Sequence, residues 1–229
     1  MTRFNLMILA AGYGKRMNNL TDSTPKPLLK INNKELLRYN IDFFTNLGCE
    51  KIVINTHYLH DKIQYFIDKH YSNRNVTLSY EPILLNTGGG IKNALSYLGD
   101  KNFIVTNSDI LWKEDNTKDV LKFINNYQNI ETCKLLLAAD RNFEGLKKSE
   151  GDFKYEDGLL KRWKKNDPHL FYTGLQIINP TVFDVIKDNS FSINKLYDLL
   201  ISKHNLQGEL SYSSIVHVGD INAFNQFKG

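Results

Sequence analysis

Short apolar runs alternate with amphipathic patterns through the first part of the chain. Apolar runs of this kind are typical of buried strands, and a hydrophobic repeat of three to four residues is typical of helices. The expected strands cover residues 4–9, 51–55, 76–80, 102–106 and 132–138. The expected helices cover residues 34–47, 61–70, 90–98 and 117–127. This alternation predicts βαβ units, and therefore an α/β fold with a Rossmann-like, doubly wound and mostly parallel sheet.

The pattern changes after Ala138, where strand signals follow one another more closely. The expected elements are a hairpin over 151–163 with its turn at Glu156-Asp157-Gly158, a strand over 169–179 that contains Gly174, helices over 180–186 and 193–204, and a strand, glycine turn and short helix over 213–224. We expect this part to form a smaller β/α subdomain that lies on the sheet, either as a lid or as the acceptor-side part of the site.

The segment that follows the first expected strand, residues 9–31, carries residues suited to phosphate binding. Gly12 and Gly14 permit a tight turn and a close approach of the backbone to a ligand. Backbone amides in such a loop can cradle phosphate groups. Lys15 and Arg16 follow directly, and an arginine can hold a phosphate through two parallel hydrogen bonds. The loop therefore indicates an anionic ligand.

A second part of the same segment places Lys26 between Pro25 and Pro27. The prolines restrict the backbone, so the lysine loses less freedom when it meets a phosphate, which favours a catalytic role. Two other phosphate motifs do not fit. A dinucleotide-binding loop would need glycine where Met17 stands, and a P-loop would need Ser or Thr where Arg16 stands. We predict that this segment wraps a nucleoside triphosphate.

The composition argues against several other classes of function. A net charge of +4 is too small to indicate nucleic acid as a partner. Cys49 and Cys133 belong to no Cys/His cluster, so we expect neither a zinc site nor a disulfide framework. No apolar segment approaches the ~20 residues that cross a bilayer, and the first residues lack the apolar core of a signal peptide. We expect a cytoplasmic protein without a membrane partner.

Five segments together resemble the sugar-1-phosphate nucleotidyltransferase family. They read LAAGYGKRM…TPKPLL, NTGGGIKNAL, VTNSDIL, FYTGLQIINPTVF and VHVGD. The resemblance implies transfer of a nucleoside monophosphate from an NTP to a sugar 1-phosphate, with release of pyrophosphate. It also implies one nucleotidyltransferase domain over residues 1–229, with a nucleotide-binding half over 1–138 and a sugar-phosphate-binding half over 139–229.

Within the family, the triple glycine Gly88-Gly89-Gly90 and the sequence GDF at 151–153 look most like the N-acetylmuramate-1-phosphate uridylyltransferases of cell-wall recycling. Mannose-1-phosphate guanylyltransferases are the second candidate. The expected partners are UTP or GTP and a sugar 1-phosphate, acting on a monomer or a homodimer. A nucleotide-binding module without catalytic turnover is the alternative from another class of function.

The resemblance assigns a role to each matching residue. It implies that the nucleotide is held by Ala11, Gly12, Gly14, Lys15, Asn55, Gly88 and Gly89. It assigns catalysis to Lys26, Arg16 and Asp109, and the sugar phosphate to Thr173, Gly174 and Lys164. Other readings stay open for three of these positions. Asn55 is also compatible with a turn residue, Asp109 with a helix cap, and any basic residue of 161–165 with the role given to Lys164. Glu81 precedes Pro82 and is expected at an extended surface position, with a place in the lining of the same cleft as the alternative.

The implied cofactor is Mg²⁺, with Mn²⁺ as a second possibility, held by Asp109 and His217. Mg²⁺ prefers oxygen ligands, and many family members carry aspartate where this chain has His217. Imidazole suits Mn²⁺ better than Mg²⁺. His217 is therefore expected to bind the metal directly or to order a metal-bound water, unless Asp220 reaches in from the next turn or the histidine is purely structural.

Overall fold

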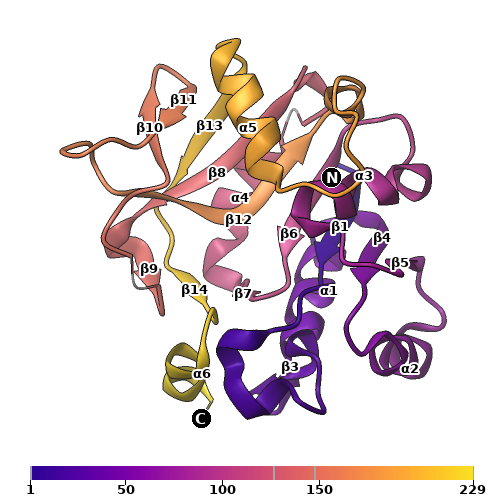
Figure 1. The fold of residues 1–229 in the computed structure, drawn as a ribbon. Helices are drawn as coiled ribbons and strands as arrows, with labels where there is room; N and C mark the ends of the chain where they lie inside the picture. The colour runs from indigo at the N-terminus through magenta and orange to yellow at the C-terminus, as the bar shows by residue number, and fades with distance from the viewer. Residues whose placement is uncertain (1, 126, 147, 229) are drawn as a thin grey trace.

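The computed structural model describes residues 2–125, 127–146 and 148–228. Its main strands are β1 (Phe4–Leu9), β4 (Cys49–Thr56), β5 (Val76–Tyr80), β6 (Phe103–Asn107), β8 (Cys133–Ala139), β10 (Phe153–Glu156), β11 (Leu159–Arg162), β12 (Leu170–Ile178) and β13 (Leu206–Ser211). Among the described residues they form one nine-stranded sheet in the order β10-β11-β13-β8-β12-β6-β1-β4-β5 (Figure 1).

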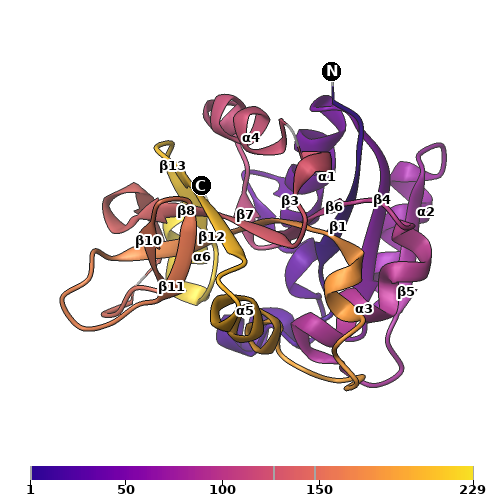
Figure 2. The same ribbon diagram turned by 90° about the horizontal axis from the view of Figure 1, so that it is seen from above.

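Helices cover both faces of this sheet, as the continuous apolar strands predict. The helices are α1 (Leu36–Asn46), α2 (His60–Tyr71), α3 (Asn86–Leu98), α4 (Thr117–Ile124), α5 (Ile193–Ser202) and α6 (Ile221–Phe227). Successive side chains of a strand point to opposite faces. Leu6 and Ile8 accordingly join the core under α1, α2 and α4, whereas Met7 joins the core under α3 and α5. Figure 2 shows α1 and α4 on one side of the sheet and α3 and α5 on the other.

The parallel part of the sheet confirms the strands expected in the first half. β1 pairs in parallel with β4 and with β6, and β4 pairs in parallel with β5. The carboxyl ends of these strands therefore lie at one edge. α3 begins earlier than expected, so that the three glycines 88–90 lie inside its first turns. The hairpin β10–β11 is also confirmed, and its turn has positive φ at Asp157 and Gly158.

The second half of the chain does not form a lid, and the sheet as a whole is mixed rather than mostly parallel. β12 runs antiparallel to both β6 and β8, and β13 runs parallel to β8, so these strands extend the same sheet. Sequence reasoning did not identify β13. Its only glycine, Gly208, faces β11, and an added Cβ there would lie 2.5 Å from Leu160 Cδ2. A glycine that permits close approach of β11 thus stands where an apolar side chain would have indicated a strand.

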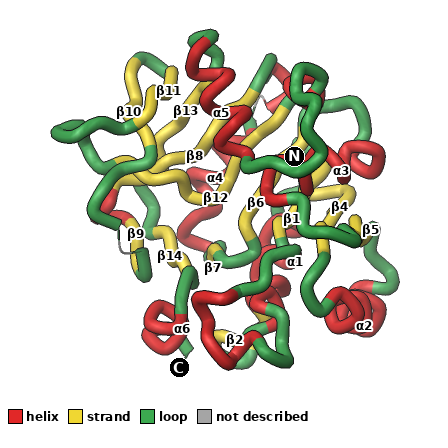
Figure 3. The backbone as a smooth tube through the Cα atoms, viewed as in Figure 1, coloured by secondary structure: helices red, strands yellow, loops and turns green. Residues whose placement is uncertain are grey.

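A small second sheet joins the C-terminal segment to the turn after β6. It contains β7 (Ile110–Leu111), β14 (Ile215–His217) and β9 (Phe143–Glu144). A separate short pair, β2 (Lys30–Ile31) and β3 (Lys34–Glu35), precedes α1. Met17, Leu36, Val218 and Phe224 share a third core cluster, which fixes α6 beside the N-terminal loop. Figure 3 shows this crowding of α6 and the β2 region at one end of the molecule.

No helix in the described ranges is long and apolar enough to span a membrane.

The carboxylate of Asp119, in α4, fixes the connection between β13 and β14. Its Oδ2 atom accepts hydrogen bonds from the hydroxyl of Ser211 (2.8 Å), from the amides of Tyr212 (2.7 Å) and Ser213 (2.9 Å), and from the Ser213 hydroxyl (2.8 Å). Burial acts to raise the pKa of Asp119, but these hydrogen bonds outweigh it and hold the pKa below its ordinary value.

We expect Asp119→Asn to lower the free energy of unfolding by about 1 kcal/mol at pH 7, because hydrogen bonds to a charged acceptor are stronger than those to a neutral one. A carboxylate whose pKa is depressed by folding stabilises the fold above its ordinary pKa and loses that contribution as pH falls through the folded value. Urea denaturation of wild type and variant should therefore converge below about pH 4. A difference that stayed constant down to about pH 2 would contradict this linkage.

Candidate functional site

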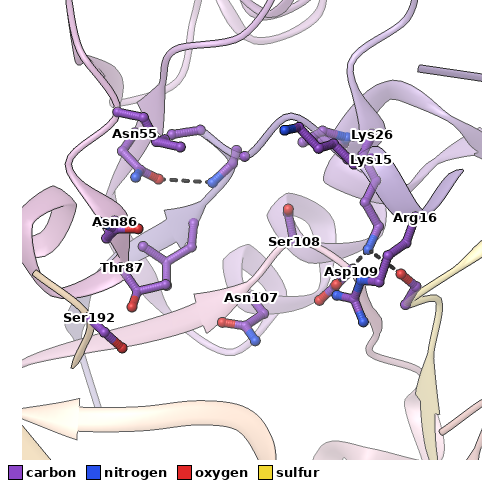
Figure 4. Close-up of a pocket in the computed structure, with 18 residues that line it drawn as sticks. Lys15, Arg16, Lys26, Asn55, Asn86, Thr87, Asn107, Ser108, Asp109 and Ser192 are labelled. Atoms are coloured by element: carbon purple, nitrogen blue, oxygen red, sulfur yellow. Dashed lines mark hydrogen bonds and ion pairs between the residues drawn. The ribbon is translucent and has the colours of Figure 1, made fainter. Parts of the chain in front are cut away.

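A cavity of about 540 Å³ lies beyond the carboxyl ends of β1, β4 and β6. This central cavity occupies the edge where open parallel sheets bind their ligands. It is lined by Leu9, Ala10, Ala11, Gly12, Gly14, Lys15, Arg16, Lys26, Pro27, Asn55, Leu84, Asn86, Thr87, Asn107, Ser108, Asp109, Ser192 and Gly219. Figure 4 shows the charged groups Lys15, Arg16, Lys26 and Asp109 at one end and the uncharged Asn55, Asn86, Thr87 and Ser192 at the other.

The loop after β1 is shaped by its glycines. Gly14 has φ +68°, a left-handed conformation that glycine adopts without strain. An added Cβ at Gly14 would lie 2.9 Å from Thr21 Cγ2 and 3.0 Å from Lys26 Cβ, so the absence of a side chain lets the two parts of the loop pack together. The space beside Gly12 is open, with no atom within 4 Å of an added Cβ. Gly12 thus leaves its backbone accessible from the cavity.

Lys26 begins a single 3₁₀ turn over Lys26–Leu28, with Pro25 directly before the turn and Pro27 inside it. The Leu28 amide donates to the Pro25 carbonyl at 2.8 Å, and both prolines are buried. This turn directs the Lys26 ammonium toward the end of β6. The Nζ atom lies 2.6 Å from Asp109 Oδ2 and 3.4 Å from the carbonyl of Gly219 (Figure 4). The sequence therefore correctly indicated a backbone that holds this lysine in place.

Asp109 lies in the turn between β6 and β7, opposite the C-terminal segment. The Ser108 amide donates to the Leu9 carbonyl (3.3 Å), which ties this turn to the loop after β1. β14 pairs with β7 so that His217 faces Ile110, and the Val218 amide donates to the Asp109 carbonyl at 2.9 Å. This register brings His217 Nε2 to 3.5 Å from Asp109 Oδ2.

The charges around Asp109 control its ionisation. Burial acts to raise the pKa of this carboxyl group. The neighbouring Lys26 ammonium and then the His217 ring outweigh burial and hold the pKa far below its usual range. Asp109 is therefore present as a carboxylate. Its Oδ1 atom and His217 Nδ1 are buried and lack a hydrogen-bond partner within the part of the chain that the structure describes.

One carboxylate oxygen of Asp220 is used to cap the helix that follows it. The Oδ1 atom accepts a hydrogen bond from the Ala223 amide (2.9 Å) at the N-terminus of α6. The ring of His217 packs over Gly219. An added Cβ at Gly219 would lie 2.5 Å from the His217 Cε1 atom, so this glycine makes room for the ring.

Asn55 and Glu81 form a buried pair at the opposite end of the cavity. Asn55 Oδ1 accepts from the Ala10 amide at 2.8 Å, and Asn55 Nδ2 donates to Glu81 Oε1 at 2.7 Å. Glu81 Oε2 accepts from the Leu85 amide at 2.9 Å. The expectation of an exposed Glu81 was wrong, because this side chain is completely buried (0% exposed). The side chain of Asn55 lines the cavity, but its polar atoms are used inside the protein.

Gly88 and Gly89, which the resemblance assigned to the nucleotide, make internal packing contacts in the structure. Both amides donate to the Phe191 carbonyl, at 2.9 and 3.1 Å. An added Cβ at Gly88 would collide with the Phe191 ring, and one at Gly89 with the Asn189 carbonyl. Neither glycine lines the central cavity. The chain before α5 thus occupies the space that these glycines leave.

Comparison with known proteins identifies the family. Residues 5–147 match the family model described as Nucleotidyl transferase. The chain is also 30% identical over 221 residues to the N-acetylmuramate alpha-1-phosphate uridylyltransferase of Caulobacter vibrioides, covering 93% of this chain and 91% of that protein. This chain belongs to the sugar-1-phosphate nucleotidyltransferase family. It is therefore an enzyme, and the alternative of a module without turnover is set aside.

Two further similarities agree with this assignment. The nucleotidyltransferase is 33% identical over 187 residues to the N-acetylmuramate alpha-1-phosphate uridylyltransferase of Neisseria meningitidis, which covers 80% of this chain and 79% of the relative. Its fold is similar to the crystal structure of HddC from Yersinia pseudotuberculosis complexed with GMP-PN. That similarity has a TM-score of 0.77 at 20% identity and covers 98% of this chain and 97% of HddC. The α/β fold is thus confirmed.

The residues expected to face the sugar do not line the central cavity of the nucleotidyltransferase. Thr173 is fully buried, and its hydroxyl donates to the Leu136 carbonyl at 2.9 Å. Gly174 has φ +85° where β12 bulges, and an added Cβ would lie 2.9 Å from Ile110 Cγ1. Gly174 therefore supports the turn that carries Asp109. Lys164 is exposed and lies outside the residues that line the cavity.

Sequence reasoning missed several residues that line the nucleotidyltransferase cavity: Leu84, Asn86, Thr87, Asn107 and Ser192. The available signal was the polar pair Asn86-Thr87 at the start of NTGGG, directly before the glycines. Ser192 gave no local signal, because it reaches the cavity only through the packing of the 189–191 segment on Gly88 and Gly89.

Proposed function

We propose that this enzyme transfers UMP from UTP to N-acetylmuramate 1-phosphate, giving UDP-N-acetylmuramate and pyrophosphate. The similarity to two N-acetylmuramate alpha-1-phosphate uridylyltransferases over most of the chain supports this choice of substrates. An oxygen of the sugar phosphate forms a bond to the α-phosphorus of UTP. The bond from that phosphorus to the bridging oxygen of the pyrophosphate breaks. No protein nucleophile is required for this exchange.

One observation carries the proposed chemistry: Lys26 and Asp109 meet at 2.6 Å in the wall of the cavity. The triphosphate would lie at this charged end, held by backbone amides near Ala11 and Gly12 and by Lys15 and Arg16. The base would lie at the uncharged end. Lys26 would exchange its contact with Asp109 for one with the α-phosphate, where a second phosphate must approach an anionic centre. Neutralising this charge is the principal catalytic requirement of phosphoryl transfer.

The donor atoms near Asp109 fit a divalent cation. The unpartnered Asp109 Oδ1 is the hard oxygen ligand that Mg²⁺ prefers, and the unpartnered Nδ1 of His217 is a donor better suited to Mn²⁺. No group of three or more His, Cys, Asp or Glu side chains suited to a metal is found in residues 2–125, 127–146 and 148–228. We propose that Asp109 and His217 bind the cation together with water and triphosphate oxygens. When bound, the cation neutralises charge on the triphosphate.

The two halves of the chain would bind different substrates. We propose that residues 1–138 supply nearly the whole nucleotide site, and that residues 139–229 bind the sugar phosphate. The cavity supports this division, since of its lining residues only Ser192 and Gly219 come from the second half.

A matrix of four NTPs against several sugar 1-phosphates tests the proposal, with released pyrophosphate as the readout. We expect the highest kcat/KM for UTP with N-acetylmuramate 1-phosphate. GTP with mannose 1-phosphate is the main competing pair, and the similarity to HddC complexed with GMP-PN is a reason to include guanine nucleotides. A preference of more than about tenfold for the guanine pair would refute the proposed specificity while leaving the class of reaction intact.

A further inference from the structure

The central cavity has two walls that come from distant parts of the chain. One is the phosphate loop, which is the loop after β1 that contains Gly12 and Gly14, and the other is the 84–87 segment. Ala10, Ala11 and Gly12 line the first wall, and Leu84 and Thr87 the second. A nucleoside triphosphate that spans both walls needs them at a fixed separation. Within the described residues the two walls are not paired with each other directly, because β4 lies between β1 and β5 in the sheet. Beyond the strand ends, side chains add a direct link between the walls.

A chain of hydrogen bonds through two side chains joins these walls. It runs from the Ala10 amide to Asn55 Oδ1 (2.8 Å), from Asn55 Nδ2 to Glu81 Oε1 (2.7 Å), and from the Leu85 amide to Glu81 Oε2 (2.9 Å). Asn55 is 3% exposed and Glu81 is 0% exposed, so water does not compete for these groups. Each carboxylate oxygen of Glu81 accepts one hydrogen bond, Oε1 from Asn55 and Oε2 from the Leu85 amide. Since Asn55 also accepts from the Ala10 amide, the chain of bonds joins the two walls.

Glu81 is tied to the phosphate loop a second time through its backbone. The ring of His57 lies between the Glu81 carbonyl, 2.7 Å from Nδ1, and the Tyr13 hydroxyl, 3.1 Å from Nε2. Because a carbonyl can only accept, Nδ1 donates to it, and Nε2 lies within hydrogen-bonding distance of the Tyr13 hydroxyl. Side chain and backbone of one residue therefore both connect to the loop that contains Gly12 and Gly14.

Gly90 is shaped by the same network. An added Cβ at Gly90 would lie 2.6 Å from Glu81 Oε1 and 2.7 Å from Asn55 Nδ2. The third glycine of NTGGG is thus needed because the pair of side chains fills the space beside it. This observation is independent of the hydrogen bonds and indicates that α3 is packed against the pair.

We propose that Glu81 is a positioning residue that sets the separation of the phosphate loop and the 84–87 segment for the nucleoside triphosphate. It touches no reacting atom. Walls that hold the nucleotide equally in the ground state and the transition state affect KM and leave kcat unchanged. The proposal requires only nucleotidyl transfer, whichever base is used, so it survives a failure of the proposed uridine specificity.

The hydrogen bond from Asn55 Nδ2 to Glu81 Oε1 has a fixed direction, and reversing that direction provides a decisive test. In Glu81→Gln, one amide N–H group must face another donor, either Asn55 Nδ2 or the Leu85 amide. In Asn55→Asp, two carboxylates meet across the 2.7 Å contact. In the double variant Glu81→Gln/Asn55→Asp, the introduced amide donates to the introduced carboxylate, and the bonds to Ala10 and Leu85 are kept. The double variant exchanges donor and acceptor in the bond between positions 55 and 81, and it keeps all three hydrogen bonds of the chain.

Steady-state kinetics would use UTP and N-acetylmuramate 1-phosphate, or the best pair from the substrate matrix if it differs. We expect each single variant to raise the KM for the nucleotide about tenfold, with kcat and the KM for the sugar phosphate within about threefold of wild type. We expect the double variant to return the nucleotide KM to within about threefold of wild type. Asp119→Asn is the matched control, since it also removes a hydrogen-bonded carboxylate but lies outside the cavity lining.

Two results would overturn the proposal. One is a double variant whose KM for the nucleotide is as high as that of the more impaired single variant. That result would show that the hydrogen-bond pattern does not determine nucleotide binding. The other is a Glu81→Gln enzyme that melts at a lower temperature but keeps the wild-type nucleotide KM, as the Asp119→Asn control is expected to do. Recovery of the nucleotide KM in the double variant would support the positioning role, because a merely structural residue would move stability alone.

Discussion

Lys26→Met is expected to lower kcat by about a thousandfold, the upper range for removal of one preorganised charge or donor at a reacting centre. Methionine keeps most of the side-chain volume and removes the ammonium. The α-phosphate would then meet the incoming sugar phosphate without this compensating charge. Since Lys26 Nζ lies 2.6 Å from Asp109, the substitution also leaves a carboxylate without its main partner. The thermal stability of the variant must therefore be measured beside its kinetics.

Lys30→Met provides the matched control for Lys26→Met. Lys30 lies four positions away, its side chain is 59% exposed, and it pairs with Glu35 at 3.5 Å, outside the cavity lining. We expect a kcat within about twofold of wild type, because an exposed ion pair contributes little. Single-turnover kinetics with saturating UTP would separate chemistry from product release. A Lys26→Met enzyme with a folded melting profile and wild-type turnover would eliminate the proposed role of Lys26.

Asp109→Asn is expected to reduce turnover by about a thousandfold as well, for a different reason. The amide keeps the shape of the side chain but presents a weaker, neutral oxygen to a divalent cation. The loss should be of the same order as the loss that chelation causes in the wild-type enzyme. Raising the Mg²⁺ or Mn²⁺ concentration should recover little of it. Titration of the nucleotide-bound protein with Mn²⁺ would report metal affinity directly.

The double variant Lys26→Met/Asp109→Asn distinguishes the contribution of the ion pair to stability from the contribution of the two side chains to catalysis. Removing one member of the Lys26–Asp109 pair leaves the other partly buried and unpaired, whereas removing both does not. We therefore expect the double variant Lys26→Met/Asp109→Asn to unfold at a higher temperature than the less stable single variant, yet to be inactive. If Asp109→Asn retained full metal-dependent turnover, Asp109 would not be the metal ligand proposed here. Asp119→Asn serves again as the carboxylate control.

Local signals in the sequence predicted the elements that depend on nearby residues. The bounds of β1 and β5 were predicted at both ends, since a continuous apolar run indicates the buried strand β1 and the β-branched residues of VTLSY favour an extended backbone in β5. The conformation of Gly14 and the turn at Lys26 follow in the same way from glycine and proline chemistry. The lid predicted after Ala138 failed, because whether a strand joins an existing sheet depends on partners far away in the chain.

The alternation of strands and helices, the glycine loop after the first strand and the lysine between two prolines could be predicted from the sequence, because each rests on backbone preferences of adjacent residues. Long-range packing places Glu81 against Asn55, brings His217 on β14 to Asp109, and packs Gly88 and Gly89 against the chain before α5. Those contacts join residues that are 26, 108 and at least 100 positions apart. At such separations the partner is selected by packing and strand register, which no local pattern records.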